Sequence, residues 1–545
     1  MEDVLYPTLL AEALKARGVT HAFGMPGGSS LPFLEAFRSV GIEFVLVRHE
    51  GSAGFMADAA FHITRAPGVC IATLGPGATN LVSGVAGSLL ERSKVVAITS
   101  QIGTAIRDRY THQILDQVAL FRPVARRVVA VNTDMAAMQT LTALATLDRH
   151  PPGPVVLDIP TEVASATVSE ADARWGMHAR PRPIPDVSHA AELLQKARRP
   201  LVVVGCGELS IPVANGVRRL VTAADAVSLT TYRAVGMVDD AHPLHAGAFG
   251  LSPVVDAHQR GLFEQADLMV AVGLDIVELR PQWLPGWPED LPIVSVDAFG
   301  QDDLLGCIVE ELTGPVMETL DALREAAFGA PPDDDPDAIQ GETDWTAAAL
   351  EAHRVACMAP FDDGPDGPAA TIRAVQAGSP EGTRFSLDVG AHRITAAHVL
   401  RAGSPNQILQ SNGFSSMGTG LPGAIASRLV DPKTPAVALT GDAGLWMTVG
   451  ELGMVQERGL DLVVVYLSDA SLSLIQLKQE RIPLPDHGVT FANPRVGPLA
   501  EAFGGVGVTV RGADAVRQAV EEAHARGGLT VIEAVVDPAA YRRQM

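Results

Sequence analysis

The sequence predicts an α/β fold of three domains, each a parallel β-sheet flanked by helices. Its 545 residues exceed the roughly 100–200 residues of one typical domain. Short runs rich in Val, Ile and Leu alternate with helical segments, which is the pattern of buried parallel strands joined by helices. Two stretches interrupt this pattern, at residues 172–189 and 330–344. Together these observations favour three α/β domains.

The first domain is expected over residues 1–171. Its strands are predicted near residues 44–48, 69–74, 95–100 and 155–159, with Ala-rich helices between them. Residues 172–189 then lose helical periodicity and gain prolines, as a linker that crosses the surface does. The first domain therefore ends before this stretch.

The second and third domains are expected over residues 190–329 and 345–545. The second has predicted strands at residues 200–205, 268–273 and 292–297. Residues 330–344 contain three prolines and a cluster of acids, which favours a solvated connection over core. The third has predicted strands near residues 385–388, 436–440, 462–467 and 529–535. Each domain thus has the strands of an open parallel sheet.

Composition restricts the class of function. With 47% hydrophobic residues the chain can form a packed core. The 63 acidic and 41 basic residues give a net charge of −22, which argues against binding nucleic acid or an anionic membrane through a charged face. The four cysteines are far apart and form no C-x-x-C pair, so neither a disulfide framework nor a thiolate metal site is indicated. A small-molecule enzyme is the favoured class.

The amino-terminal segment bears on localisation. Residues 1–19 begin with acids and are typical of an amphipathic helix, without the basic start and apolar block of a signal peptide. No stretch reaches the about 18 uninterrupted apolar residues that a membrane span needs. We therefore expect a cytoplasmic protein.

Two acidic residues follow neighbouring predicted strands of the third domain. Asp442 lies in the segment Gly441–Gly444, directly after the strand at residues 436–440, and Asp469 follows the strand at residues 462–467. Ligands bind at this edge of open parallel sheets. Small residues let backbone N–H groups approach a phosphate, and two carboxylates with a diphosphate suit Mg²⁺. The alternative is that both aspartates cap turns and helices.

The stretch from residue 441 to residue 469 resembles the thiamine-diphosphate motif of the acetolactate synthase, pyruvate decarboxylase and benzoylformate decarboxylase family. That motif opens with Gly-Asp-Gly and closes with two asparagines. Here Ala443 replaces the second glycine, and Ser468 and Asp469 replace the asparagines. The residues that the resemblance implies for Mg²⁺ are Asp442, Asp469 and Ser471, the last through its main-chain carbonyl. Those implied for the diphosphate are Gly441, Ala443 and Gly444.

The two departures have physical consequences. Ala443 can supply its N–H to a phosphate only if its backbone angle suits a residue with a Cβ. Asp469 keeps an oxygen ligand and adds a negative charge, which strengthens the attraction for Mg²⁺ or Ca²⁺ at some cost in repulsion from the diphosphate.

A second match lies in the first domain. Residues 23–28 (FGMPGG) resemble the family's first loop, in which Gly27 would contact the cofactor, and residues 48–50 (RHE) resemble the end of its second strand. A lone Glu50 is otherwise a solvated surface carboxylate. The resemblance implies instead that Glu50 is catalytic. It would hydrogen-bond the aminopyrimidine ring of thiamine diphosphate and so promote formation of the nucleophilic ylid, while the cofactor carries the chemistry.

A third match follows in the same domain. Residues 73–80 (TLGPGATN) resemble the family's Gly-Pro-Gly-x-x-Asn loop, which borders the pyrimidine and the substrate. A Gly-Pro-Gly turn alone is weak evidence, but this one directly follows another predicted strand. The resemblance assigns Gly75 and Asn80 to cofactor binding.

Two further segments concern the substrate. Residues 111–113 (THQ) lie where acetolactate synthases, benzaldehyde lyase and carboxyethylarginine synthase have a glutamine beside the reacting carbon. Gln113 is therefore implied to act at the catalytic centre. His112 is a second candidate, with an ordinary loop histidine as the alternative. Lys478 replaces a tryptophan usual in acetolactate synthases, which suggests either a carboxylate or phosphate on the substrate, or a solvated lysine.

The third domain carries two more matches. Residues 413–422 (GFSSMGTGLP) resemble the segment whose bulky apolar side chain wedges between the two rings of the cofactor and brings its amino nitrogen to the thiazolium carbon. Met417 occupies that position, with a flexible core residue as the alternative. Residues 388–392 (DVGAH) resemble the start of the diphosphate domain, where His392 would donate to a phosphate.

Taken over nearly the whole chain, the resemblance implies pyrimidine-binding, central and diphosphate-binding domains. It implies thiamine diphosphate and Mg²⁺ as cofactors and a homodimer or homotetramer, with the glutamate and the diphosphate loop facing each other across a subunit interface. The adjacent histidine pair of pyruvate decarboxylases is not evident. We therefore expect an acetolactate-synthase-like carboligase, which decarboxylates a 2-keto acid and transfers the acyl group to an acceptor.

Several alternatives stay open. One is a simple 2-keto acid decarboxylase or lyase, and another is a catalytically silent cofactor-binding homologue. A third, a nicotinamide oxidoreductase, is suggested by residues 202–207 (VVVGCG), which keep only the first two glycines of the dinucleotide fingerprint. FAD, which some family members hold in the central domain, is also left open. Neither nucleic acid nor a membrane is expected as a partner.

Overall fold

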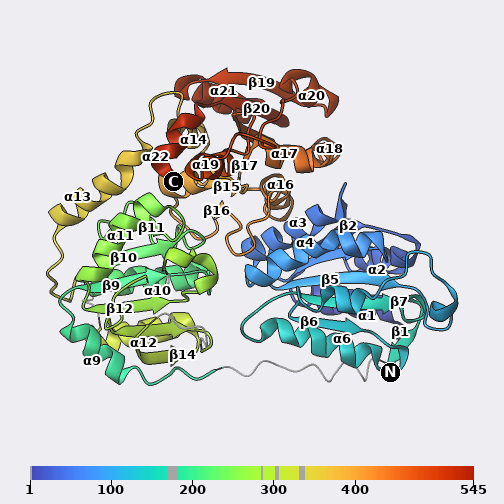
Figure 1. Ribbon diagram of the computed structural model, residues 1–545. Coiled ribbons are helices and arrows are strands. Elements are labelled where there is room, and N and C mark those ends of the chain that lie inside the picture. Colours follow the sequence, from blue (N-terminus) through green and yellow to red (C-terminus); the bar gives the residue numbers. More distant parts are fainter. Residues whose placement is uncertain (1–2, 170–181, 284–285, 301–305, 331–337) are drawn as a thin grey trace.

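The computed structural model describes residues 3–169, 182–283, 286–300, 306–330 and 338–545. It contains three six-stranded sheets, one for each domain (Figure 1). Neighbouring strands within these sheets are parallel. The predicted α/β class with three flanked parallel sheets is therefore confirmed. Parts of both predicted linkers, residues 172–181 and 331–337, lie outside the described residues.

The N-terminal sheet has the strand order β3-β2-β4-β5-β7-β6. Its strands are β2 (His21–Met25), β3 (Glu43–Leu46), β4 (Gly68–Ala72), β5 (Val95–Gln101), β6 (Arg127–Ala130) and β7 (Val155–Pro160). Its helices are α1 (Tyr6–Lys15), α2 (Leu31–Ser39), α3 (Glu50–Thr64), α4 (Pro76–Leu90), α5 (Gln117–Phe121), α6 (Ala136–Ala145) and α7 (Thr161–Ala164). A short antiparallel pair, β1 (Asp3–Leu5) and β8 (Thr167–Ser169), lies beside it.

Helices cover both faces of this sheet because successive strand residues point to opposite sides. In β4, Val69 and Ile71 belong to the core cluster that includes residues of α1, α2 and α6. Cys70 and Ala72 of the same strand belong to the cluster that includes residues of α3 and α4. The sheet is thus buried on both sides, as its continuous apolar runs predict.

The central sheet has the order β11-β10-β9-β12-β13-β14. Its strands are β9 (Pro200–Val204), β10 (Val227–Thr231), β11 (His245–Phe249), β12 (Leu268–Val272), β13 (Ile293–Asp297) and β14 (Ile308–Thr313). Its helices are α9 (Ser188–Lys196), α10 (Ile211–Ala223), α11 (Pro253–Gln265) and α12 (Val316–Phe328). Helix α13 (Ala347–Met358) leads from this domain to the next.

The C-terminal sheet has the order β16-β15-β17-β18-β20-β19. Its strands are β15 (Arg384–Leu387), β16 (Ile408–Leu409), β17 (Ala436–Gly441), β18 (Leu462–Ser468), β19 (Val506–Arg511) and β20 (Leu529–Val535). Its helices are α14 (Pro368–Ala377), α15 (Ala391–Val399), α16 (Gly420–Val430), α17 (Asp442–Thr448), α18 (Leu452–Glu457), α19 (Ser473–Arg481), α20 (Val496–Ala502), α21 (Ala513–Arg526) and α22 (Tyr541–Gln544).

The N-terminal and C-terminal domains share one hydrophobic core. A single cluster of buried side chains contains residues of α3 and α4 together with residues of α16 and of strands β17 and β18. Small residues lie where the domains meet: a Cβ at Gly423 of α16 would lie 3.9 Å from the Cβ of Ala59 on α3. The relative placement of the two domains is therefore set by apolar packing.

Every predicted strand is present. Sequence reasoning missed β1, β2, β6, β8, β10, β11, β14, β16 and β19, for more than one reason. Edge strands β14 and β19 alternate exposed and covered side chains, so they lack the continuous apolar run of a buried strand. Strands β2 and β10 are buried but short and contain Gly, Ser or Thr. None of the described helices is long and apolar enough to span a bilayer.

Candidate functional site

Two neighbouring strands of the C-terminal sheet lead to the two predicted carboxylates. Strands β17 and β18 pair in parallel, with Gly441 opposite Leu467. Asp442 is the first residue of α17, and Asp469 directly follows the end of β18. Asp442 is buried, with 2% of its surface exposed. Strand order thus brings both aspartates to one edge of the sheet.

The Asp442 carboxylate is held by two segments distant in sequence. Its Oδ2 accepts hydrogen bonds from the Ala470 N–H at 2.8 Å and from Nδ2 of Asn493 at 3.0 Å. Asn493 also donates to Oγ of Ser468 at 3.0 Å and accepts from Nε1 of Trp446 at 2.9 Å. Sequence reasoning missed Asn493 because it lies in an irregular segment without a motif.

Asp469 is held by its own loop. Its Oδ1 accepts from the Ser471 N–H at 3.2 Å, and its Oδ2 accepts from the Ser473 hydroxyl. Burial, followed by the negative charge of Asp442, raises the pKa of Asp469 to about 6. A divalent cation between the two carboxylates would offset this repulsion.

A cavity of about 200 Å³ opens at this edge. It is lined by all the residues that the sequence assigned to the diphosphate and metal in this domain, namely His392, Met417, Gly441, Asp442, Ala443, Gly444, Asp469 and Ser471. Leu474 and Ile475 of α19 form another part of the wall. The structure therefore gathers the predicted residues of the third domain around one space.

The Ala443 departure is accommodated by the backbone. Ala443 lies inside α17 and is not among the residues with positive φ, so its Cβ causes no strain. Its N–H donates to Oδ1 of Asp442 at 2.8 Å. Gly444 has a different requirement, because a Cβ there would lie 1.9 Å from Oδ2 of Asp388. Gly444 is thus needed for packing against that buried carboxylate.

Asp388 fastens three segments around the cavity. Its Oδ1 accepts from the Val389 N–H at 2.7 Å and from the Gly418 N–H at 2.8 Å. Its Oδ2 accepts from Oγ1 of Thr440 at 3.1 Å. The residue is 1% exposed, and burial raises its pKa. Asp388 therefore links the start of the domain, the Met417 segment and β17.

His392 lines the cavity and has a buried ring nitrogen without a partner. It is 4% exposed, and its Nε2 has no hydrogen-bond partner in the described part of the chain. Burial, with the nearby positive charge of Arg393, lowers the pKa of His392 to about 3, so the ring is neutral. A buried nitrogen without a partner is costly, which indicates that a ligand supplies the missing contact.

The donor set fits Mg²⁺ with a diphosphate. The described residues contain no group of three or more His, Cys, Asp or Glu side chains that could hold a metal ion. A cation at Asp442 and Asp469 would therefore need further oxygens, from a main-chain carbonyl and from phosphates. The cavity provides space for such an anion, and His392 faces it.

At the N-terminal sheet, Glu50 is the first residue of α3, a few residues beyond the end of β3. It is 6% exposed and accepts from Nδ2 of Asn80 at 2.9 Å. A Cβ at Gly77 would lie 3.2 Å from its Oε1. The alternative of a solvated surface carboxylate is therefore wrong, and the predicted position at a strand end is corrected to a helix start.

The loop that begins at Gly75 lies against the segment of the substrate candidates. Gly75 has a φ of +66°, and a Cβ there would lie 2.6 Å from the carbonyl oxygen of Gln113. Its N–H donates to Oε1 of Gln117 at 2.8 Å, and Nε2 of Gln117 donates to the Ser100 carbonyl at 3.0 Å. His112 and Gln113 are exposed. Gln117 is a positioning residue that sequence reasoning missed.

Gly27 completes this edge. A Cβ at Gly27 would lie 2.2 Å from Oγ1 of Thr73, and a Cβ at Gly77 would lie 2.9 Å from Cγ2 of the same threonine. The predicted residues of the first domain, Gly27, Glu50, Gly75, Asn80 and Gln113, therefore lie on loops and helix starts at the carboxyl edge of the N-terminal sheet.

The two edges remain separate within one chain. All residues that line the C-terminal cavity come from the C-terminal domain. Instead, residues 48 and 49 are bound by Glu451 of the same chain, whose carboxylate accepts from the Arg48 and His49 N–H groups at 3.1 Å. Among the described residues, the cavity at Asp442 is therefore not lined by Glu50.

Family models agree with this division of the chain. Residues 6–120 match the thiamine pyrophosphate enzyme N-terminal TPP binding domain, residues 187–323 match the central domain of these enzymes, and residues 388–534 match their C-terminal TPP binding domain. The chain belongs to the thiamine pyrophosphate enzyme family. Thiamine pyrophosphate is another name for thiamine diphosphate.

Similar proteins place the chain in the acetolactate-synthase-like part of this family. It is 27% identical to the acetolactate synthase of Bacillus subtilis over 97% of this chain and 92% of that protein. It is 25% identical to a probable acetolactate synthase large subunit of Methanocaldococcus jannaschii, over 97% and 91%. It is 27% identical to the acetolactate synthase isozyme 2 large subunit of Escherichia coli, over 94% and 92%.

The dinucleotide-like loop of the central domain has no free backbone donor at its glycines. The Gly205 N–H donates to the Val272 carbonyl and the Gly207 N–H to the Gly273 carbonyl, both at 2.9 Å. The N–H between them, of Cys206, donates to the Glu278 carboxylate at 3.0 Å. A cavity of about 430 Å³ lies between this loop and the N-terminal domain. The match of residues 187–323 to the central domain of thiamine pyrophosphate enzymes favours that domain over the nicotinamide oxidoreductase alternative.

Lys478 does not reach the cavity. It is exposed on α19 and is not among the cavity residues, whereas Ile475 on the same helix is. Of the two alternatives for this lysine, the described structure favours the solvated one.

Proposed function

We propose that this protein decarboxylates a 2-keto acid and transfers the acyl group to an acceptor, as an acetolactate-synthase-like carboligase. The observation that carries the proposal is the C-terminal cavity, which Asp442, Asp469 and His392 line together. When bound, thiamine diphosphate supplies a carbanion nucleophile and an electron sink for decarboxylation. The names of the similar proteins make acetolactate synthesis the first reaction to test.

The metal and phosphates would be bound by local groups. In this proposal, Asp442, Asp469 and the carbonyl of Ser471 hold Mg²⁺, and the small residues 441–444 leave room for the diphosphate. His392 contacts a phosphate through Nε2. Such local devices are required because the net charge of −22 repels an anionic ligand.

The ring end of the cofactor would lie against the N-terminal edge. Glu50 hydrogen-bonds the aminopyrimidine there and manages its proton, while Asn80 orients the Glu50 carboxylate. Gly27 and Gly75 let the backbone approach the ring. Met417, at the cavity wall, keeps the two rings in a bent arrangement.

The separation of the two edges supports an assembly. We propose a homodimer, or a homotetramer built from such dimers, in which Glu50 of one protomer faces the cavity of its partner. Apolar side chains are exposed near the cavity, with Met447 at 63% and Ile475 at 43%. A second copy of the chain would cover them.

Substrate contact is assigned to the exposed loop of His112 and Gln113. In the assembled site this loop would border the reacting carbon. Two alternatives are kept, a simple 2-keto acid decarboxylase or lyase and a catalytically silent cofactor-binding homologue. Product identification with pyruvate, alone and with candidate aldehyde or keto acid acceptors, separates them: a carboligation product supports the proposal, CO₂ with an aldehyde supports the lyase, and cofactor binding without turnover supports the silent homologue.

A Glu50→Gln variant tests the site directly. We expect turnover and proton exchange at the thiazolium carbon to slow by about 10²–10⁴-fold, as for loss of an acid–base group. NMR of the bound cofactor measures the exchange. Glu35→Gln, which changes an exposed carboxylate of the same domain, is the matched control. An unchanged exchange rate in Glu50→Gln would contradict the assignment.

The compartment and further cofactors are also part of the proposal. We propose a cytoplasmic enzyme that binds neither nucleic acid nor a membrane, in keeping with its acidic composition. We also propose that it holds no FAD, because the loop at residues 205–207 already uses its backbone donors within the chain.

A further inference from the structure

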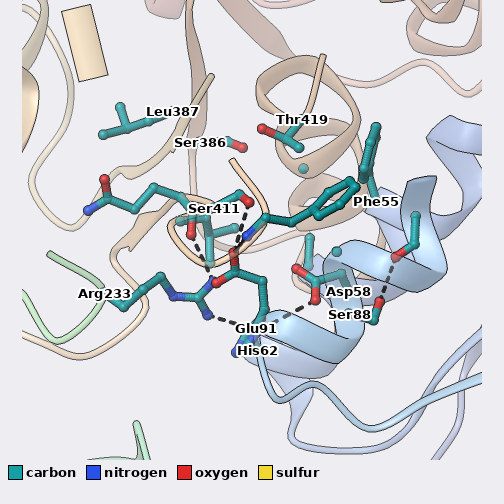
Figure 2. A pocket seen from close by; sticks show the side chains of 17 residues that line it. Phe55, Asp58, His62, Ser88, Glu91, Arg233, Ser386, Leu387, Ser411 and Thr419 are labelled. Carbon is teal, nitrogen blue, oxygen red and sulfur yellow. Dashed lines mark hydrogen bonds and ion pairs between the residues drawn. The ribbon is translucent and has the colours of Figure 1, made fainter. Parts of the chain in front are cut away.

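A buried ion pair lies where the three domains meet. Glu91 follows the end of α4, and Arg233 follows β10 of the central domain. Their side chains are 4% and 5% exposed, and Nη1 of Arg233 is 2.8 Å from Oε2 of Glu91. Figure 2 shows the Glu91 carboxylate between Arg233 and Ser411, with His62 and Asp58 nearby.

Two cavities border this pair. The one that both Glu91 and Arg233 line has a volume of about 40 Å³, which is room for a few waters at about 10–15 Å³ each. Glu91 and His62 also line the cavity of about 430 Å³ between the N-terminal and central domains, but Arg233 does not. What Glu91 and Arg233 do together is therefore sought in the chain segment that both side chains bind.

Both side chains bind the same segment of the C-terminal domain. Oε1 of Glu91 accepts from the Ser411 hydroxyl at 2.8 Å and from the Gly413 N–H at 2.9 Å. Nη1 of Arg233 donates to the Gln410 carbonyl at 2.8 Å. The N-terminal and central domains thus each contact the chain between residues 410 and 413.

This segment leads directly into the cofactor cavity. The Ser415 N–H donates to Oγ of Ser411 at 3.2 Å, and Ser415 and Met417 both line the cavity. One residue further, the Gly418 N–H is held by Asp388 at 2.8 Å. The segment Ser411–Met417 is therefore held by its own domain at both ends, through Asp388 and through Arg393, which donates to the Ser411 carbonyl and to Oδ1 of Asn412. The Glu91–Arg233 pair adds contacts from the other two domains at the Ser411 end.

The other terminal nitrogen of Arg233 is bound by a neutral side chain. Nη2 of Arg233 donates to Nε2 of His62 at 2.8 Å. Burial, followed by the positive charge of Arg233, lowers the pKa of His62 to about 4, so its ring accepts as a neutral group. The main-chain N–H of Arg233 also donates to Glu278 at 3.2 Å. The guanidinium is thus held in one orientation.

Stability alone does not account for such a pair. Taking two charges out of water is costly, and a buried ion pair is often no more stabilising than apolar residues of the same volume. The pair instead orients the groups that it binds, because a guanidinium presents its donors in a rigid planar arrangement and a carboxylate accepts at preferred angles.

We propose that Glu91 and Arg233 form a positioning pair, which sets the segment Ser411–Met417 at the wall of the cofactor cavity and couples it to the other two domains. The proposal rests on the proposed function for the identity of the ligand. Its structural part, control of this segment by residues of two other domains, stands independently.

Hydrogen–deuterium exchange and cofactor titration test the pair. In Glu91→Gln and in Arg233→Met, we expect the amides of residues 411–417 to exchange about tenfold faster or more in the cofactor-free protein, since removing one partner leaves the other buried and unpaired. The dissociation constant of thiamine diphosphate with Mg²⁺, measured by calorimetry, should rise by a similar factor. Ser411→Ala, which keeps both charges, should give a smaller change in the same direction.

Asp275→Asn is the matched control. It weakens another ion pair between the N-terminal and central domains, with Arg92 Nε 2.7 Å from Asp275 Oδ2. Both readouts should stay at the wild-type value. If Glu91→Gln, Arg233→Met and Ser411→Ala lower the melting temperature but leave exchange and cofactor affinity unchanged, the pair only fastens the domains and the proposal is overturned. Failure of the wild type to bind thiamine diphosphate would instead overturn the proposed function, and the exchange result would still decide the positioning role.

Discussion

The C-terminal and central domains have the same kind of sheet and small residues in the loops after their strands, yet only one leaves polar groups available. In the C-terminal domain, the carboxylates of Asp442 and Asp469 border a cavity that His392 also lines. In the central domain, the N–H groups of residues 205–207 are all hydrogen-bonded within the chain. The pair of carboxylates, and not the glycine-containing loop alone, therefore distinguishes the C-terminal edge as the site for a metal and a diphosphate.

The largest expected effect follows from Asp442→Ala. This change removes a proposed Mg²⁺ ligand and the acceptor that holds the Ala470 N–H, so we expect the affinity for thiamine diphosphate with Mg²⁺ to fall by about 100-fold or more. Isothermal titration calorimetry measures the affinity. Asp461→Ala, in the loop before β18, is a control that leaves the cavity intact. If Asp442→Ala and the wild type bound thiamine diphosphate with equal affinity, Asp442 would not be a metal ligand and the C-terminal edge would not be distinguished from the central one.

His392→Gln should have a smaller effect on the same equilibrium. A neutral hydrogen bond contributes about 1 kcal/mol, so loss of the Nε2 contact should weaken cofactor binding by roughly five- to tenfold. His398→Gln is the matched control, because this histidine of α15 bonds to the Tyr232 hydroxyl and not to the cavity. A loss of affinity that is the same in both variants would show that α15 acts through packing alone.

Glu278 should make the stability of the protein depend on pH. Burial raises the pKa of Glu278 to about 7 from the model-peptide value of 4.5. The folded state therefore binds more protons than the unfolded state between these values, and this group's contribution to stability falls as the pH rises through that window. Urea unfolding at pH 5 and pH 8 should show Glu278→Gln gaining about 1–3 kcal/mol relative to wild type at the higher pH.

The exposed Glu264→Gln is the control for this titration, and its stability relative to wild type should not change between the two pH values. A pH-independent difference for Glu278→Gln would show that Glu278 does not change its protonation on folding.

The smallest expected effect concerns dinucleotides, for which we expect no binding. The purified protein should show no flavin absorbance, and added FAD or NAD should produce no heat of binding, because the loop at residues 205–207 has its donors engaged. Binding of either dinucleotide at micromolar concentration would show that this loop rearranges to release its N–H groups. The central domain would then also be able to bind a ligand at this edge, and the contrast with the C-terminal domain would be lost.

The sequence could predict what local pattern and strand order determine. Asp442 and Asp469 follow two apolar runs separated by one helix, and consecutive strands of a parallel sheet commonly pair, so their meeting at one edge was predictable. The sequence also predicted that Ala443 needs a backbone angle suited to a residue with a Cβ. Its position inside α17 meets this requirement. His392 and Met417 came from resemblance and line the same cavity.

The remaining parts of the site depend on contacts between distant segments. Asn493, Gln117 and Glu451 each bind a predicted segment from far along the chain, and nothing in their own surroundings marks them. The Glu91–Arg233 pair joins two domains to a third. Such contacts follow from how the domains pack, which no local pattern contains.

The central claim, that the C-terminal edge is a cofactor site and the central edge is not, is tested most directly by one calorimetric titration. Thiamine diphosphate added to the purified protein in Mg²⁺ should bind at one site per chain, and this heat should be lost in Asp442→Ala and persist in Glu264→Gln, which changes an exposed carboxylate of the central domain. The account would be contradicted by the absence of saturable binding in the wild type, or by binding that survives Asp442→Ala.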